Sequence, residues 1–107
     1  MSVKAVVLYP HPTNKDEFNR RYQEEHIPLC RQFAHMTQMV MTPVLGGPRG
    51  KAEFYRIVEM HFPSMEALQA DFGSAVGKQT AVHAAEISTG GAPTVLICGA
   101  DELIGNP

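Results

Sequence analysis

Two short segments, one near each end of the 107-residue chain, are apolar on both sides of an extended backbone. The first runs from Val3 to Tyr9, and its alternating sets are Val3, Ala5, Val7 and Tyr9 on one side and Lys4, Val6 and Leu8 on the other. The second runs from Thr94 to Cys98 and has the same character. A β-strand that is apolar on both faces must be covered on both faces. Any fold for this chain therefore has to provide two layers of cover for these strands.

The length and the composition indicate a single globular domain. A chain of 107 residues suits one domain, and an apolar fraction of 44% is typical of a folded protein and argues against disorder. A domain this small buries about two-thirds of the surface of its unfolded chain, so burial against a partner would add to its stability. We expect residues 1–107 to form one domain, with 99–107 as a loose tail.

Charge and cysteine content argue against several classes of function. Nine basic and eleven acidic residues give a net charge of −2, without the basic face that a nucleic-acid-binding protein presents. Cys30 and Cys98 lie far apart and match no zinc-site spacing. The first apolar run is too short for a signal peptide or a membrane span. We therefore expect a reduced, cytoplasmic protein that binds neither nucleic acid nor membrane.

Between the two apolar segments, the pattern predicts two helical regions and two further strands. The first helix begins at about Asp16, after a polar capping sequence, and carries an apolar stripe. A methionine-rich strand over 36–45 and a strand over 54–62 flank a glycine-rich loop and form a hairpin. Ser64 is a good N-cap for the second helical region, which breaks near Gly73 and continues over 75–87.

The order of elements is strand, helix, strand, strand, helix, strand, which is the pattern of a ferredoxin-like α+β fold. Two helical regions on one face of a four-stranded antiparallel sheet leave the other face open. That face still carries apolar residues, and a large exposed apolar surface usually marks an interface. The simplest cover is the same face of an identical chain, which would make the protein a homodimer. The alternative is that the loops and the tail fold back over the sheet, although few apolar residues remain in them.

Five segments of the chain match motifs of one known family. They are VVLYPHP at 6–12, the spaced Phe18, Tyr22, His26 and Pro28 within FNRRYQEEHIPL, LGGPRG at 45–50, FYRIVEMHF at 54–62 and STGG at 88–91. In these residues the chain resembles the EthD family of the dimeric α+β-barrel group. The resemblance extends to about Gly99, and its most specific part is the spaced tyrosine, histidine and proline of the first helix.

The resemblance implies a homodimer whose two sheets pack face to face, with a small-molecule cleft between helices and sheet in each subunit. Relatives in this group include polyketide cyclases, dehydratases, lactone isomerases and cofactor-free monooxygenases. Others are encoded beside oxidative degradation systems, and many have no assigned reaction. The tyrosine and histidine that serve the plant polyketide cyclases have no counterparts that we can place in this chain, so their mechanism is not transferred to it.

His26 is the strongest candidate for a catalytic residue. It lies four residues after Tyr22, on or beside the helical stripe that faces the sheet. Pro28 lacks the N–H that would bond the carbonyl of Glu24, so we expect the helix to kink or restart there. A histidine beside such a break can project into a gap and transfer protons near neutral pH. The alternative is a structural histidine that bonds a carbonyl freed by the proline, and the family motif is the main reason to prefer a functional role.

Tyrosines and polar side chains extend the candidate site. Tyr22 and Tyr9 are candidates to orient a substrate oxygen or to stabilise an enolate, or are core aromatic residues. In the third strand Tyr55, Ile57, Glu59 and His61 alternate onto one face. Because the sequence does not say which face this is, Glu59 and His61 are candidates either for substrate binding or for an ion network at the interface.

His83 shares a helical face with Val76, Thr80 and Ile87 and is a further candidate to line the cleft, although a capped or exposed histidine is the preferred interpretation. Its spacing to Glu86 suits a metal pair, but further ligands are missing and no metal is expected. The segment GGPRGK at 46–51 has one residue too few between its glycines for a P-loop and precedes a strand. Dinucleotide and serine-nucleophile motifs are missing as well, so we expect no cofactor.

Three functional hypotheses follow. The leading one is a cofactor-independent lyase- or isomerase-type enzyme that transfers protons on a small carbonyl or phenolic compound, in an isomerisation, cyclisation or dehydration. In this enzyme hypothesis His26 is the acid or base, and Tyr22 assists it. The rival is a ligand-binding or accessory protein of an oxidative degradation or biosynthetic pathway, and the third is a cofactor-free monooxygenase. The enzyme hypothesis requires that His26 face a cavity and that a polar neighbour set its tautomer.

Overall fold

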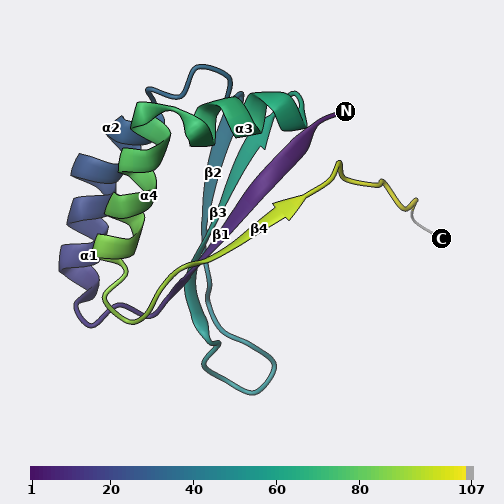
Figure 1. The fold of residues 1–107 in the computed structure, drawn as a ribbon. Coiled ribbons are helices and arrows are strands. Elements are labelled where there is room, and N and C mark those ends of the chain that lie inside the picture. The colour runs from purple at the N-terminus through teal and green to yellow at the C-terminus, as the bar shows by residue number, and fades with distance from the viewer. Residues whose placement is uncertain (106–107) are drawn as a thin grey trace.

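The computed structural model describes residues 1–105 of the chain and shows strands and helices in the predicted order (Figure 1). The strands are β1 (Val3–Pro10), β2 (Gln38–Pro43), β3 (Phe54–Phe62) and β4 (Thr94–Cys98). The helical elements are α1 (Lys15–Arg21), the π-helical turn η1 (Tyr22–His26), α2 (Ile27–Cys30), α3 (Met65–Gly73) and α4 (Ala75–Ile87). Over the described residues, no helix is long and apolar enough to cross a membrane.

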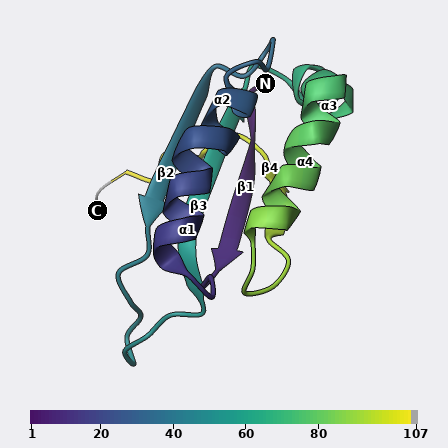
Figure 2. The same cartoon turned by 90° about the vertical axis from the view of Figure 1, so that its left-hand side faces the viewer.

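The four strands form one antiparallel sheet in the order β2-β3-β1-β4. β1 lies in its interior, where Leu8 is opposite Ile57 of β3 on one side and Thr94 of β4 on the other. Figure 2 shows both helical regions on the same side of this sheet. The predicted ferredoxin-like α+β architecture is therefore confirmed.

Short polar side chains begin the helices. Asn14 accepts a hydrogen bond from the N–H of Glu17, and Ser64 accepts one from the N–H of Ala67. Both bonds satisfy backbone donors that have no partner within the first helical turn. Ser64 is the predicted cap. The first helix begins at Lys15, one residue earlier than predicted, because the asparagine provides its cap.

The first helix widens into a π turn just before Pro28. The N–H of Ile27 donates to the carbonyl of Tyr22, five residues earlier, over the stretch Tyr22–His26. Pro28 has no N–H for the carbonyl of Glu24, and its ring would crowd that carbonyl. The predicted kink is therefore a bulge within a continuous helix, and it changes the direction in which His26 projects.

One hydrophobic core lies between the helices and the facing side of the sheet. Its aromatic centre is Tyr9 of β1, whose ring contacts Phe18 and Tyr22 edge-on at centroid distances of 5.2 and 6.1 Å. Edge-to-face contacts of this kind add to the free energy of burial. The buried apolar residues are Val3, Ala5, Tyr9, Phe18, Tyr22, Cys30, Phe33, Val58, Met60, Phe62, Leu68 and Ile87.

β2 is shorter than the predicted strand over 36–45, because a buried carboxylate holds the residues before it. The side chain of Asp71 accepts hydrogen bonds from the N–H groups of His35 and Met36 at 2.9 Å. Asp71 is buried near the end of α3. Backbone donors that bond a side chain cannot also pair with a neighbouring strand, so the first backbone bond to β3 is from the N–H of Thr37 to the carbonyl of His61, at 2.8 Å.

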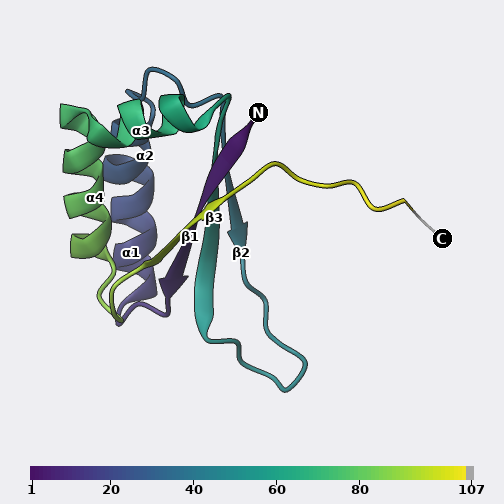
Figure 3. The same ribbon diagram turned by 45° about the vertical axis from the view of Figure 1, so that its right-hand side comes forward.

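Within residues 1–105, no helix covers the other face of the sheet (Figure 3). Leu96 of β4 lies opposite Val6 of β1 on this open face and is 47% exposed. Residues 99–105 form neither helix nor strand, and Figures 1 and 3 show them leading away from the sheet. Residues 106 and 107, the end of the expected loose tail, lie outside the described residues. Asp101 of the tail lies 3.0 Å from Nζ of Lys4 on the open face, but the tail leaves Leu96 exposed.

Candidate functional site

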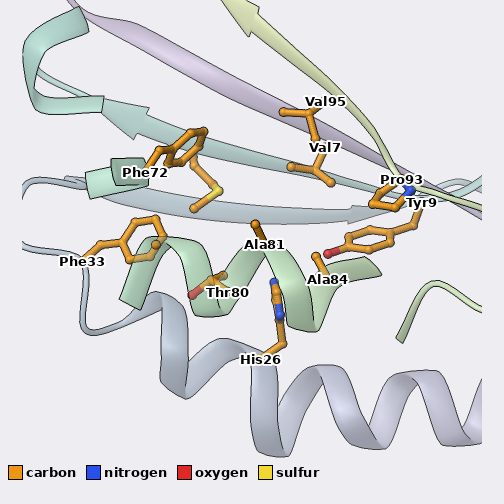
Figure 4. A pocket seen from close by; sticks show the side chains of 12 residues that line it. Val7, Tyr9, His26, Phe33, Phe72, Thr80, Ala81, Ala84, Pro93 and Val95 are labelled. Carbon is orange, nitrogen blue, oxygen red and sulfur yellow. The ribbon is translucent and has the colours of Figure 1, made fainter. Parts of the chain in front are cut away.

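A cavity of about 320 Å³ lies between the sheet and α4 (Figure 4). Figure 4 shows Val7 and Val95 on the strand side, Ala81 and Ala84 on the α4 side, and His26 pointing towards the space between them. The volume falls in the range of small-molecule sites. The residues that line it are Val7, Tyr9, His26, Phe33, Met60, Phe72, Gly77, Thr80, Ala81, Ala84, Pro93 and Val95.

Small residues on one face of α4 leave room for this cavity. Gly77, Ala81 and Ala84 are spaced by four and three residues, so they share a helical face. Gly77 also allows α3 and α4 to meet at a tight corner, because a Cβ atom there would overlap the carbonyl oxygens of Asp71 and Phe72. The cavity therefore arises from the sequence of α4 and from the corner that precedes it.

His26 reaches the cavity from the π turn and is only 4% exposed. Its Nδ1 lies 2.9 Å from Nδ1 of His83 on α4. The two imidazole rings stack with their planes 19° apart and their centroids 5.1 Å apart. Within residues 1–105 the Nε2 atom of His26 has no hydrogen-bond partner. The imidazole thus bonds a side chain, and not the backbone carbonyl that a purely structural role was expected to use.

His83 joins His26 to a carboxylate at the surface. The Nε2 atom of His83 lies 2.9 Å from Oε1 of Glu25, and Nε of Arg21 donates to the same oxygen at 3.0 Å. The side chain of His83 is 12% exposed and that of Glu25 is 37% exposed. His83 is therefore largely buried, contrary to the preferred interpretation of the sequence. It does not line the cavity itself, and it links the cavity histidine to solvent through Glu25.

The protonation states of this cluster follow from burial and hydrogen bonding. Burial lowers the pKa of His26 to about 4, and the neighbouring His83 adds to the shift, so the His26 imidazole is uncharged near neutral pH. Hydrogen bonds from His83 and Arg21 hold the pKa of Glu25 below its ordinary value, so Glu25 is ionised. Burial raises the pKa of the Tyr9 hydroxyl well above its usual range, so it keeps its proton.

The two candidate tyrosines line different spaces. Tyr9 lines the cavity, and Figure 4 shows its hydroxyl pointing inwards, near Ala84. Tyr22 packs against His26 with ring centroids 5.3 Å apart, but its hydroxyl is buried without a hydrogen-bond partner. It lines a second, smaller hollow of about 210 Å³ beside the methionines of β2. Tyr9, and not Tyr22, is therefore the tyrosine beside the space that His26 faces.

Glu59 and His61 lie on the opposite side of the sheet from His26. In the register of β1 and β3, Glu59 is opposite Val6 and His61 is opposite Lys4, on the open face. The Nζ of Lys4 is 2.8 Å from Oε1 of Glu59, and Nε2 of His61 is 4.0 Å from the same oxygen. The two residues thus form an ion network on the open face and do not reach the cavity.

Tyr55 does not share the face of Ile57, Glu59 and His61, so the alternation predicted for the third strand is wrong at this residue. The register of β1 and β3 shifts between Tyr9 and Pro10, next to Tyr55. As a result Tyr55 turns to the helix side, where its hydroxyl donates to Oδ1 of Asn19 on α1 at 3.0 Å. Beyond a β-bulge of this kind, side chains point to the face of the sheet opposite to the one that regular alternation predicts.

Sequence reasoning did not single out Glu25. Its spacing of four residues from Arg21 suits a helical ion pair, and that pair could have been predicted. The bond that matters for the site joins Glu25 to His83, 58 residues away, and nothing in the local pattern indicates it. No group of three or more His, Cys, Asp and Glu side chains that could hold a metal ion occurs within residues 1–105.

Together, the fold and the site define a ferredoxin-like α+β domain with an apolar cavity between helices and sheet and a histidine projecting from a π turn. The model of the EthD domain matches residues 10–87, which is more than half of the chain. The chain belongs to the EthD family.

The solved structures that are similar to this chain include the following three. An ethyl tert-butyl ether D (EthD) family protein from Bacillus halodurans is 31% identical, with a TM-score of 0.85 and coverage of 96% of this chain and 100% of that one. A hydroxynitrile lyase from Passiflora edulis is 15% identical, with a TM-score of 0.77 and coverage of 97% of each chain. A dimeric ferredoxin-like protein of unknown function from Jannaschia sp. is 11% identical, with a TM-score of 0.73 and coverage of 94% and 100%. The latter two similarities establish the fold alone.

Proposed function

We propose that this protein is a cofactor-independent enzyme that transfers a proton on a small, partly apolar carbonyl or phenolic compound bound in the cavity. The observation that carries the proposal is the Nε2 atom of His26, an imidazole nitrogen without a protein partner at the wall of an apolar cavity. An uncharged imidazole with a free lone pair is suited to act as a general base.

Tyr9 supplies the complementary group. Removal of a proton from the carbon beside a carbonyl places negative charge on the carbonyl oxygen, and a hydroxyl that keeps its own proton can stabilise that charge by a hydrogen bond. Burial holds the pKa of the Tyr9 hydroxyl high, which keeps this donor available. The apolar walls exclude water and so strengthen both interactions. His26 would then return the proton at another atom in an isomerisation or to a leaving hydroxyl in a dehydration.

The named lyase among the similar structures supports a lyase-type reaction by analogy only. The Passiflora edulis protein is a hydroxynitrile lyase on the same fold, and a shared fold does not transfer an activity. The argument for this chain therefore depends on His26 and Tyr9.

Deuterium exchange tests the proposal without knowledge of the natural substrate. Small ketones such as acetophenone and cyclohexanone are incubated with the protein in D₂O, and loss of their α-proton signals is followed by NMR. We expect exchange above the buffer rate, with about a 10²-fold or larger reduction in His26→Gln, as is typical of a general base. His35→Gln, at an exposed position, is the control. Exchange that His26→Gln leaves unchanged would contradict the role of His26.

Ligand binding without catalysis is the second candidate function, and the low pKa of His26 favours it. An imidazole with a pKa of about 4 is a weak proton acceptor, although its lone pair still accepts hydrogen bonds. In an accessory protein of this kind, phenol binds in the cavity and His26→Gln weakens the binding about tenfold. Neither variant nor wild type would exchange the α protons of a bound ketone.

We also propose that the chain forms a homodimer through the open face of the sheet. The support is the apolar surface on β4, where Leu96 remains 47% exposed. Face-to-face packing of two sheets would remove this surface from water. A cytoplasmic location is likewise a proposal. It rests on two free cysteines, of which Cys30 is buried with its pKa raised to about 11.

A further inference from the structure

The carboxylate of Glu25 fixes the direction of its hydrogen bond to His83. Three cationic or N–H groups surround it: Nε of Arg21 at 3.0 Å, a guanidinium nitrogen of Arg20 at 3.7 Å, and Nε2 of His83 at 2.9 Å. The hydrogen bonds from His83 and Arg21 hold the pKa of Glu25 below its ordinary value, so the side chain is ionised. An ionised carboxylate can only accept hydrogen bonds. Nε2 of His83 therefore carries a proton and donates it to Glu25.

The direction of the bond between His83 and Glu25 determines the direction of the bond between His26 and His83. An uncharged imidazole that carries its proton on Nε2 has a lone pair on Nδ1. When His83 is uncharged, its Nδ1 is therefore an acceptor, and the Nδ1 of His26, 2.9 Å away, must be the donor. Burial keeps His26 uncharged near neutral pH, so its other ring nitrogen then has no proton. The tautomer of the buried histidine thus follows from a carboxylate on the surface of the same helix.

We propose that Glu25 and His83 are positioning residues that hold His26 in the Nδ1–H tautomer. Its Nε2 then presents a lone pair to the cavity, and the site binds uncharged ligands that donate an O–H group. The ligand class rests on the proposed function, because it places the ligand in the same cavity.

The composition of the cavity wall supports this ligand class. Among the residues that line the cavity, only His26 and Tyr9 are titratable, and both are uncharged near neutral pH. Burial of an anion without a cation nearby is costly, and an imidazole lone pair would repel it. Thr80 already donates its hydroxyl proton to the carbonyl of Val76 at 2.7 Å, so it offers the cavity no donor. A neutral phenol or alcohol therefore fits this site better than a carboxylate.

The tautomer of His26 is measurable by NMR of ¹⁵N-labelled protein, because a protonated ring nitrogen and one with a lone pair resonate far apart. At about pH 8.5, where imidazoles are uncharged, we expect the wild type to show a proton on Nδ1 of His26 and a lone pair on Nε2. Glu25→Leu removes the acceptor, so the two nitrogen signals of His26 should move towards each other as both tautomers become populated. Glu25→Gln keeps an amide oxygen as acceptor and should retain most of the wild-type pattern.

Glu24→Leu is the matched control, because Glu24 is the adjacent residue on the same turn and, within residues 1–105, its ion pair is with Arg20 and not with His83. Its His26 signals should match those of the wild type. A proton on Nε2 of wild-type His26 at this pH would overturn the proposal, and so would Glu25→Leu signals equal to those of the wild type. Melting temperatures near that of the wild type would show that the variants are folded.

Three probes of similar size test the ligand class. Phenol carries an O–H donor, anisole lacks it, and benzoate is an anion. We expect phenol to shift the Nε2 signal of His26, anisole to bind about tenfold more weakly, and benzoate not to bind. Phenol that fails to bind at millimolar concentration, or benzoate that binds as tightly as phenol, would overturn the ligand class. The tautomer measurement uses no ligand, and the deuterium-exchange test does not depend on Glu25. Failure of the tautomer proposal can therefore be distinguished from failure of the proposed function.

Discussion

The Nδ1 atoms of His26 and His83 lie 2.9 Å apart, although the two residues are 57 positions apart in the sequence. This contact joins the π turn of the first helix to α4 by a polar bond beside an apolar cavity. A buried hydrogen bond of this kind stabilises the fold only while its two partners keep compatible protonation states. The contact therefore makes stability dependent on pH.

We predict that acid destabilises the protein through His26. Its pKa is about 4 in the folded protein and about 6.5 in the unfolded chain. Between these values the unfolded state binds more protons, so the free energy of unfolding is highest above about pH 6.5 and falls as the pH is lowered towards 4. The loss is at most about 3 kcal/mol. Urea unfolding between about pH 7.5 and 4.5 measures it, and His26→Gln should remove most of this dependence.

His35→Gln is the control for this measurement, because His35 is exposed. Its free energy of unfolding should fall with pH as that of the wild type does. If His26→Gln loses stability as steeply as the wild type over the same range, the buried imidazole is not the group responsible.

Pro28→Ala tests whether the proline imposes the π turn. Alanine restores an N–H that can donate to the carbonyl of Glu24 and removes the ring that crowds it. Return to a regular α-helix would rotate His26 by up to about 100°, the angle per helical residue, and break its bond to His83. The ¹⁵N signals of His26 should then resemble those of an unpaired imidazole. Pro48→Ala, in an exposed loop, is the control, and unchanged His26 signals in Pro28→Ala would show that the turn has another cause.

We predict that Gly77→Ala destabilises the protein. In an ordinary helix this substitution stabilises by up to about 1 kcal/mol. Here the new methyl group would overlap the carbonyl oxygens of Asp71 and Phe72, and overpacking of this kind costs about 1–3 kcal/mol. Gly73→Ala is the control, because a Cβ at Gly73 has open space around it. Urea unfolding distinguishes the two variants, and a more stable Gly77→Ala would mean that α3 and α4 do not meet as closely as described.

The fold could be predicted because its signals are local. A short run that is apolar on both faces defines β1, and Ser64 caps the helical region after β3, so the order of elements follows from short windows of sequence. The break at Pro28 also follows from a local rule, since proline has no N–H. Its form, a π turn in a continuous helix, depends on how the surrounding helix packs.

The candidate site could be predicted only in part, because it combines local and distant contacts. His26 was identified from the proline and the family motif. Its partners were not, since the bonds to His83 and from there to Glu25 depend on where α4 packs. The side of the sheet on which Glu59 lies could not be assigned either, because both sides of β3 combine apolar and polar residues and only its register with β1 places that residue on the open face.

The proposed dimer makes the last prediction. Leu96 lies on the open face of the sheet, and Leu96→Lys would place an unpaired charge within the proposed sheet-on-sheet interface, at a cost of several kcal/mol. Each 1.4 kcal/mol weakens association tenfold, so a wild-type dimer at micromolar concentration should become a monomer. Val82→Lys is the control, because Val82 is 69% exposed on α4, on the helix side. Sedimentation velocity gives the masses, and a wild type that sediments as a monomer at about 10 µM would refute the interface, because an interface of standard size binds more tightly than this.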